Sequence, residues 1–185
     1  GGGLLQMLGV GDWDSLLSAC LALLENPRKV ESLVERTTDF YCICLERVLS
    51  KVTVDYASFY EPIASNSGPL MSPLMFKRFA IPGYRKIMDL LEKYQVPLRI
   101  LCTTGGDLTY LLPSLIDAGI NGLWISNIQS TRMKYTRLRR QFGTEVALIG
   151  GIDATALARD EAAVRKAVEE TVPGLLERGH YLPCL

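Results

Sequence analysis

One repeated unit constrains the fold of this chain most strongly. It consists of a short apolar run, then polar residues, then a segment whose apolar residues recur with helical periodicity. The clearest copy lies at residues 146–153 (VALIGGID), where a continuous apolar run ends at two glycines and Asp153. A continuous run is typical of a strand that is buried on both faces. Because Gly150 and Gly151 permit a sharp turn, we interpret the stretch as a parallel strand that delivers Asp153 to the edge of a sheet.

The same unit recurs along the chain. Strands are predicted at residues 52–58, 98–102, 122–126, 146–149 and 181–183. Helices are predicted at residues 14–24, 27–49, 72–79, 82–94, 111–119, 134–142 and 160–177. Strands that alternate with helices predict a parallel sheet, and right-handed crossovers place all carboxyl ends of the strands on one side. Active sites of such folds lie on that side.

Length and composition suit one globular domain over residues 1–185, with 48% hydrophobic and 22% charged residues. A closed eightfold β/α barrel takes about 250 residues, and only five strands are predicted here. We therefore expect an α/β chain of the (β/α)8 TIM-barrel type that is incomplete. Either the chain is a fragment, or segments are missing from its numbering.

Charge and targeting features exclude several classes of function. The 20 Lys and Arg residues balance 20 Asp and Glu residues, which gives no electrostatic argument for binding nucleic acid or an anionic membrane. A basic cluster is interpreted as a solvated helix face rather than a binding patch; it comprises Lys134, Arg137, Arg139 and Arg140. No apolar run is long enough to span a bilayer and no signal peptide is seen, so we expect a cytoplasmic protein.

The cysteines predict thiols rather than a disulfide framework. Their number is odd and they form no CxxC pair: Cys20, Cys42, Cys44, Cys102 and Cys184. Cys102 and Cys184 lie near predicted strand ends, which makes them the candidate metal ligands. A zinc site needs a third ligand that the sequence does not reveal, so we expect no cofactor, with zinc as the alternative.

Polar residues near the predicted strand ends are the candidate site residues. Asp153 is either an edge carboxylate or the N-cap of the next turn, and one residue can fill both roles. Glu61 is either a catalytic acid or a solvent-exposed carboxylate. Thr103 and Thr104 with Gly105 could present hydroxyl and N–H groups to a carboxylate or phosphate.

Several segments, in a fixed order, carry a resemblance to a known family. They are YEPIA (60–64), GPLMSP (68–73), FAIPGY (79–84), GG (105–106), LP (112–113), AGING (118–122), RRQFGTEVALIGGID (139–153) and GHYLP (179–183). In this order and at these intervals the chain resembles the uroporphyrinogen decarboxylase superfamily. Its members are β/α barrels that include the haem-pathway decarboxylase and the zinc-dependent corrinoid methyltransferases.

The resemblance implies a lyase that takes a porphyrinogen or a related carboxylated small molecule at the barrel mouth, without a cofactor. The catalytic candidates are then Glu61, Asp153 and His180, and His180 is otherwise a structural residue. The substrate-binding candidates are Thr103, Thr104, Gly105 and Asn127, the last at a position where many relatives carry glutamate. By resemblance, an arginine-bearing segment and a catalytic aspartate would precede Gly1, and a further histidine would follow Leu185.

Two alternatives remain open at this point. The methyltransferase branch of the superfamily carries His-x-Cys near the position of Cys102 and a later cysteine, a pattern that Cys102, Thr104 and Cys184 match poorly. A zinc- and corrinoid-dependent methyltransferase-like enzyme is one alternative, and a non-catalytic binding fragment is the other. The expected partner is a small-molecule substrate, and a homodimer is the expected assembly.

Overall fold

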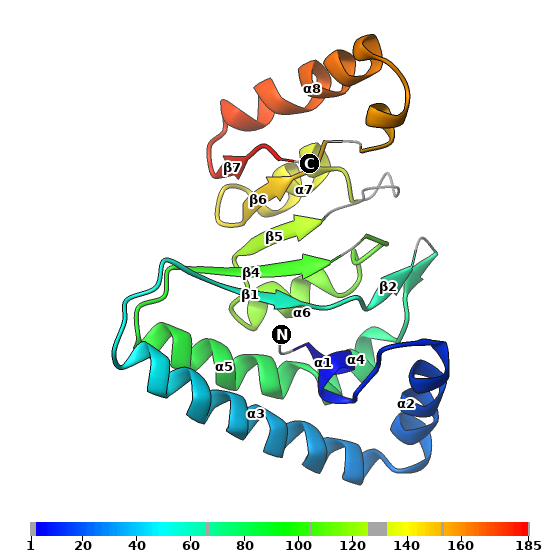
Figure 1. The fold of residues 1–185 in the computed structure, drawn as a ribbon, viewed down its shortest axis with the longest axis vertical. Helices are drawn as coiled ribbons and strands as arrows, with labels where there is room; N and C mark the ends of the chain where they lie inside the picture. Colours follow the sequence, from blue (N-terminus) through cyan, green and yellow to red (C-terminus); the bar gives the residue numbers. More distant parts are fainter. Residues whose placement is uncertain (1–2, 66, 104, 126–132, 153, 185) are drawn as a thin grey trace.

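The computed structural model describes residues 3–65, 67–103, 105–125, 133–152 and 154–184 (Figure 1). Five strands form one sheet in the order β1-β4-β5-β6-β7, and every neighbouring pair is parallel. The strands are β1 (Tyr56–Tyr60), β4 (Leu98–Thr103), β5 (Gly122–Ile125), β6 (Ala147–Gly150) and β7 (Tyr181–Leu182). The predicted parallel α/β sheet is thereby confirmed.

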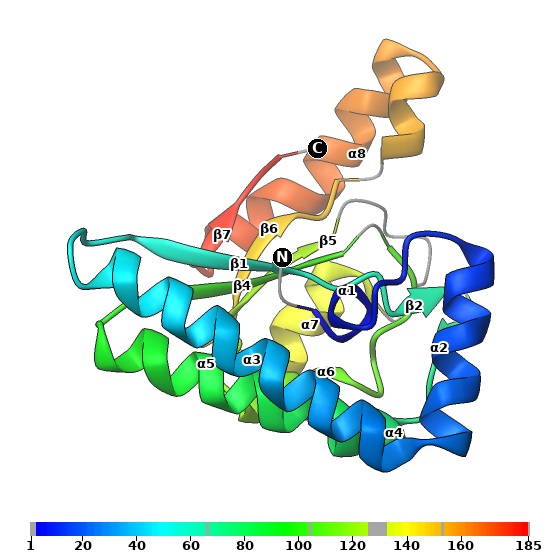
Figure 2. The ribbon, with the colours of Figure 1, turned by 60° about the horizontal axis from the view of Figure 1, so that its bottom comes forward.

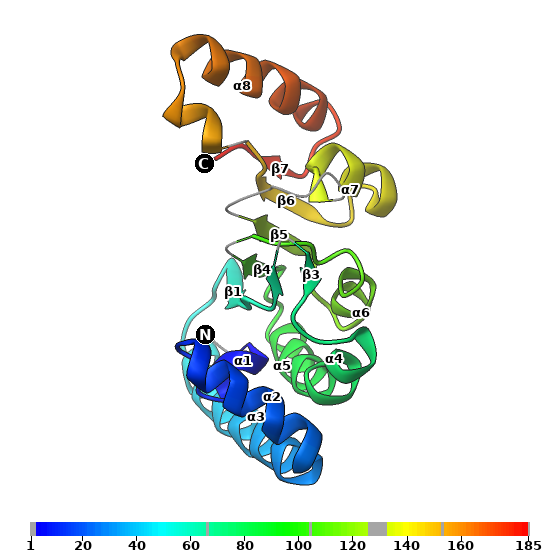
Figure 3. The same cartoon turned by 90° about the vertical axis from the view of Figure 1, so that its right-hand side faces the viewer.

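Helices precede β1 and also follow the later strands of the sheet along the chain. They are α1 (Leu4–Met7), α2 (Trp13–Glu25), α3 (Pro27–Leu49), α4 (Pro73–Phe79), α5 (Ile81–Lys93), α6 (Leu112–Asp117), α7 (Tyr135–Phe142), the 3-10 helix η2 (Ala154–Ala158) and α8 (Glu161–Leu176). Helices α4 to α7 cover one face of the sheet (Figure 3), and α3 packs on α5 as a second layer (Figure 2). The pattern did not predict α1 or the short antiparallel pair β2 (Ala64–Ser65) and β3 (Gly68–Pro69).

Local sequence sets the start of several helices. The Ser72 side chain accepts a hydrogen bond from the Met75 N–H at 3.2 Å, and Pro73 occupies the first turn of α4. The Asp160 carboxylate accepts from the Ala163 N–H at 2.7 Å at the start of α8. Ser72 and Asp160 are therefore the N-caps of α4 and α8.

The long helix α3 buries a narrower stripe than its periodicity predicts. Val30, Val34 and Thr38 are buried, whereas Leu33 and Val48 are exposed to 47% and 53%. The reason is that α3 lies outside the first helix layer, so only the side that faces α1, α2, α4 and α5 is covered.

The two faces of the sheet have different environments. One face packs on the helices through buried side chains that include Phe59, Leu101, Leu123 and Leu148, and these belong to a single hydrophobic cluster. On the other face, hydrogen-bonded register aligns one residue from each strand near its carboxyl end: Tyr60, Cys102, Trp124, Ile149 and Leu182. We call these five residues the carboxyl-end row. Within the described residues the sheet stays open and no barrel closes, as the predicted incomplete barrel requires.

None of the described helices has the length and apolar character needed to cross a membrane.

Candidate functional site

The carboxyl-end row is accessible at three of its five residues, whereas Ile149 is buried. Tyr60, Trp124 and Leu182 are exposed to 38%, 40% and 59%. Cys102 lies between the two aromatic residues in register, and burial raises the pKa of its thiol, which therefore stays protonated near neutral pH. The row carries no formal charge, so it offers aromatic and apolar contact rather than an ionic clamp.

Glu61 lies immediately after β1 and is completely buried, so it is not the solvent-exposed acid that the sequence left open. Its carboxylate accepts hydrogen bonds from the backbone N–H of Leu4 at 2.5 Å, the backbone N–H of Leu5 at 3.3 Å and the Tyr84 hydroxyl at 3.1 Å. Burial raises the pKa of Glu61 to about 7, and the three donors oppose that rise. The group can therefore hold a proton near neutral pH, beneath the α1 segment.

The loop after β4 is held by a hydrogen bond within the loop and by close packing against β2. Thr103 is buried and its hydroxyl donates to the Gly105 carbonyl at 3.3 Å, within the loop. A Cβ atom at Gly106 would lie 2.6 Å from the Ala64 carbonyl, so the loop presses against β2. The Thr103 hydroxyl therefore bonds to a carbonyl group inside the loop, and it is not presented outward to a ligand.

The turn after β6 is built around Tyr135, which the sequence did not indicate as a site residue. Its hydroxyl donates to the Ile149 carbonyl at 2.7 Å and accepts from the Ile125 N–H at 3.0 Å, so it ties β5 to β6. Its ring lies against Gly151, which has φ +84°. The only available signal was an aromatic residue at the start of the helix after β5, which packing alone would explain.

Three of the predicted site residues lie outside the described residues: Thr104, Asn127 and Asp153. Their roles stay predictions.

The two candidate metal ligands lie on different strands. Cys184 follows β7 and its Sγ lies near Gly150 on β6, whereas Cys102 is on β4. With neighbouring strands about 4.8 Å apart, the two thiols are separated by roughly 10 Å or more. A zinc ion binds each thiolate at about 2.3 Å, so this arrangement does not let them share one ion. The described residues hold no group of three potential metal ligands, and zinc does not fit this part of the chain.

His180 lies at the opposite end of the sheet from the carboxyl-end row. It precedes β7, and its Nδ1 lies 2.6 Å from the Thr144 carbonyl. Its own carbonyl accepts from the buried Arg139 guanidinium at 2.9 Å, and Arg139 also donates to the Val146 carbonyl at 2.9 Å. His180 thus joins β7 to the loop before β6, which is the structural role left open by the sequence. Arg139 is correspondingly not part of a solvated face, because it is 3% exposed.

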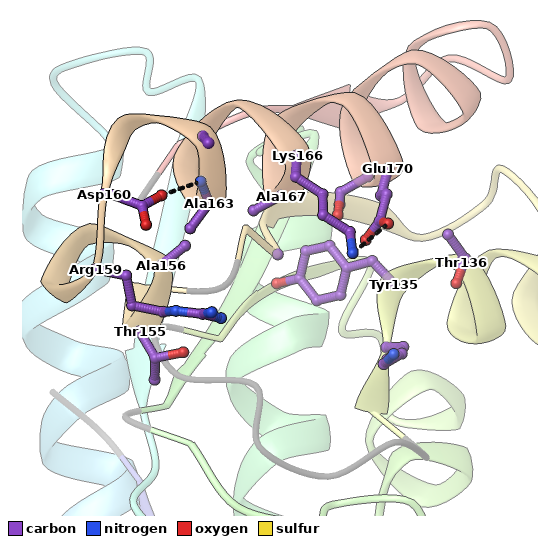
Figure 4. Close-up of a pocket in the computed structure, with 14 residues that line it drawn as sticks. Tyr135, Thr136, Thr155, Ala156, Arg159, Asp160, Ala163, Lys166, Ala167 and Glu170 are labelled. Carbon is purple, nitrogen blue, oxygen red and sulfur yellow. Dashed lines mark hydrogen bonds and ion pairs between the residues drawn. The ribbon is translucent and has the colours of Figure 1, made fainter.

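A cavity of about 620 Å³ opens beside the turn after β6 (Figure 4). One wall is the start of α7, with Lys134, Tyr135 and Thr136, and Gly151 also lines the cavity. The other wall is η2 and one side of α8, which contribute Arg159, Asp160, Ala163, Lys166, Ala167 and Glu170 among others. The cavity therefore lies at the carboxyl end of β6, on the helix side of the sheet.

The parallel sheet, the helices that cover one face of it and the partly exposed carboxyl-end row define a protein of the β/α-barrel class, represented here by an open part. The chain belongs to the uroporphyrinogen decarboxylase (URO-D) family, whose model matches residues 10–182. This confirms the resemblance carried by the sequence segments.

Individual relatives are distant. The chain is 23% identical over 150 residues to uroporphyrinogen decarboxylase of Hordeum vulgare, a match that covers 75% of this chain and 43% of the relative. It is also 23% identical over 150 residues to uroporphyrinogen decarboxylase 2, chloroplastic, of Oryza sativa subsp. japonica, covering 75% of this chain and 37% of that protein. The chain thus spans about two fifths of the length of these curated relatives.

A solved structure shares the fold. A methyltransferase from Methanosarcina mazei superposes with a TM-score of 0.65 at 20% sequence identity, and the match covers 91% of this chain and 47% of that protein. This likeness bears on the fold alone.

Proposed function

We propose that this chain forms part of a carboxy-lyase of the URO-D family, which acts on a porphyrinogen or a related carboxylated small molecule. The observation that carries the proposal is the family match over residues 10–182, on a sheet whose carboxyl-end row is open to solvent. The protein would work in the cytoplasm, and a homodimer is the proposed assembly.

The carboxyl-end row supplies the binding surface in this proposal. Tyr60 and Trp124 flank Cys102 and present aromatic faces on which a flat pyrrole ring can stack. Apolar surroundings disfavour a carboxylate relative to water, and losing CO2 relieves that cost. The row would therefore promote decarboxylation by holding the ring in contact with an uncharged surface.

Proton delivery is the second requirement, because the electron pair left by the departing CO2 must be protonated on carbon. Glu61 is the proposed acid, since its raised pKa of about 7 keeps it protonated and it directly follows Tyr60. Because α1 covers Glu61, the proposal requires this segment to move when substrate binds. The other proposed residues keep their predicted roles: Asp153 in catalysis, and Thr104, Gly105 and Asn127 in substrate binding.

Tryptophan fluorescence tests the proposed surface directly, because the chain has two tryptophans in different places. Trp124 is on the carboxyl-end row, and Trp13 is at the start of α2. We expect uroporphyrinogen, added under anaerobic conditions, to quench fluorescence saturably in the wild-type chain. The quenching should persist in Trp13→Phe and disappear in Trp124→Phe, with far-UV circular dichroism confirming that both variants fold.

Two results would contradict the proposal. One is quenching that persists in Trp124→Phe, which would place the ligand away from the row. The other is the lack of saturable quenching in the wild-type chain together with no coproporphyrinogen after prolonged incubation.

A further inference from the structure

The cavity between α7 and the η2–α8 segment has an excess of positive charge. Three cationic side chains line it, namely Lys134, Arg159 and Lys166, against the two carboxylates of Asp160 and Glu170. None of the site candidates that the structure describes lines this cavity, and no residue of the carboxyl-end row does.

The two carboxylates have defined partners. Glu170 pairs with Lys166 at 3.7 Å, and Asp160 accepts from the Ala163 N–H at 2.7 Å as the cap of α8 (Figure 4). Arg159 and Lys134 have no acidic partner within 4.0 Å among the described parts of the chain. Two cations from opposite walls thus remain available to a bound anion.

The rest of the lining favours an organic anion over a bare inorganic one. Ala156, Ala163, Ala167 and the Tyr135 ring give the cavity an apolar part. A volume of about 620 Å³ lies within the range of small-molecule sites, roughly 300–1,000 Å³, and exceeds what a single phosphate ion fills. The positive end of the α7 dipole lies on the same wall as Lys134 and adds to the attraction for negative charge.

We propose that this cavity is a binding site for a small organic anion, with its carboxylate or phosphate group held between Arg159 and Lys134 and its apolar body against the alanines of α8. Arg159 directly follows η2, and Figure 4 shows its side chain extending toward the α7 wall. The inference does not depend on the proposed lyase activity, because Arg159 and Lys134 are not among the residues assigned to the lyase site.

The negative charge of Asp160 disfavours a bound anion, and removing that charge tests the proposal. Its carboxylate faces the same cavity, so its charge repels an anion. Asparagine caps a helix about as well as aspartate but carries no charge. The change Asp160→Asn should therefore tighten anion binding without loosening α8. Asp14→Asn in the first turn of α2 is the matched control, because it removes the same charge far from the cavity.

The experiment is an NMR titration of the 185-residue chain with phenyl phosphate, benzoate and inorganic phosphate, followed at the backbone amides of Thr136, Ala163 and Ala167. We expect saturable shifts with the two aromatic anions, with a dissociation constant of about 1 mM, and weaker binding of inorganic phosphate. Comparing phenyl phosphate with benzoate distinguishes a phosphate site from a carboxylate site.

Substitutions then show which charged side chains contribute to binding of the anion. Arg159→Gln and Lys134→Gln should each weaken binding of the aromatic anion about fivefold, and Asp160→Asn should strengthen it about threefold. Asp14→Asn and Arg28→Gln should leave it unchanged. Shifts that do not saturate, equal affinity in Arg159→Gln and wild type, or an Asp14→Asn effect as large as that of Asp160→Asn would each overturn the proposal. Loss of tryptophan quenching by uroporphyrinogen would bear only on the lyase proposal.

Discussion

The ring of Tyr135 occupies the space that a side chain at residue 151 would need. A Cβ atom at Gly151 would lie 2.3 Å from Cδ2 of Tyr135, which is far inside van der Waals contact. The Tyr135 hydroxyl meanwhile bonds to the Ile149 carbonyl, two residues before that glycine. One side chain thus fixes both the end of β6 and the turn that leads to η2.

Gly151→Ala should strongly destabilise the protein. The alanine would need a positive φ, +84°, and would collide with the Tyr135 ring, so we expect a loss of about 3 kcal/mol in the free energy of unfolding. Gly9→Ala is the matched control, because Gly9 has φ +74° at the left-handed end of α1 but nothing within 4 Å, and it should cost only about 1 kcal/mol. Urea denaturation followed by circular dichroism compares them, and equal losses would contradict the steric account.

Tyr135→Phe isolates the hydroxyl. It leaves the Ile125 N–H and the Ile149 carbonyl without their partner in a buried place, which should cost about 2 kcal/mol. Tyr181→Phe removes a single bond to the Gly150 carbonyl at a half-buried position and should cost less than 1 kcal/mol. The same denaturation measurement decides the order, and a larger loss in Tyr181→Phe would show that the Tyr135 link between β5 and β6 carries little energy.

Glu61 should make stability depend on pH. Its folded pKa of about 7 lies above the ordinary value of 4.5, so between these two values the folded protein binds more protons than the unfolded chain. The free energy of unfolding should therefore fall as pH rises from about 4.5 to about 7, by at most ~3 kcal/mol, and then level off.

Glu61→Gln should remove this slope, because the amide does not titrate. Glu31→Gln on the exposed side of α3 is the control and should keep it. Stability measured at intervals from pH 4.5 to 8 provides the test. A wild-type protein that becomes more stable across this range, or a slope unchanged in Glu61→Gln, would contradict the placement of a buried carboxyl group.

Arg139 should be essential to the position of β7. Its guanidinium donates to the carbonyls of Gly143, Val146 and His180, which join α7, the loop before β6 and the start of β7. Arg139→Met would leave these carbonyls without a donor and should cost about 3 kcal/mol. Arg140→Met, at the exposed neighbouring position, should change stability by less than 0.5 kcal/mol. Comparable losses in both variants would refute this role.

Turnover of uroporphyrinogen by this polypeptide alone should be slow. Several propionate groups need cationic partners held in place, whereas the carboxyl-end row is uncharged and Glu61 is covered by α1. We expect binding with little coproporphyrinogen formed in an anaerobic assay of the purified chain. Formation at a normal enzymatic rate would show that the row and its surroundings already contain a competent site.

The fold was predictable because its signals are local. Continuous apolar runs located the strands to within a few residues, apart from β1, which was expected at residues 52–58 and lies at Tyr56–Tyr60. That strand carries alternating exposed and buried side chains, and so lacks the continuous apolar run that marked the others. Helix α1 escaped prediction because four residues show no periodicity.

The site was less predictable because its contacts are long-range. A glutamate before a proline suggests an exposed loop, and nothing near it in sequence indicates that α1 buries it. Cys102 and Cys184 each lie near the carboxyl end of a strand. In the sheet, however, β5 and β6 lie between the two strands concerned, β4 and β7. His180 directly precedes the strand predicted at residues 181–183, and the structure places it there, at the amino end of β7.

The contact between α1 and Glu61 makes two amide groups reporters of a distant ionisation. The N–H of Leu4 donates to a carboxyl group 57 residues further along the chain, and the N–H of Leu5 donates to the same group. Deuterium replaces an amide hydrogen only when its bond opens, so exchange at these two positions follows the opening of the segment that covers Glu61. Because the pKa of the covered carboxyl group is raised to about 7, opening is less favourable when Glu61 is protonated. The two amides should therefore exchange more slowly at pH 5 than at pH 8, once rates are corrected for the intrinsic effect of pH. The opening of the segment can therefore be timed without a ligand, a label or a mutation.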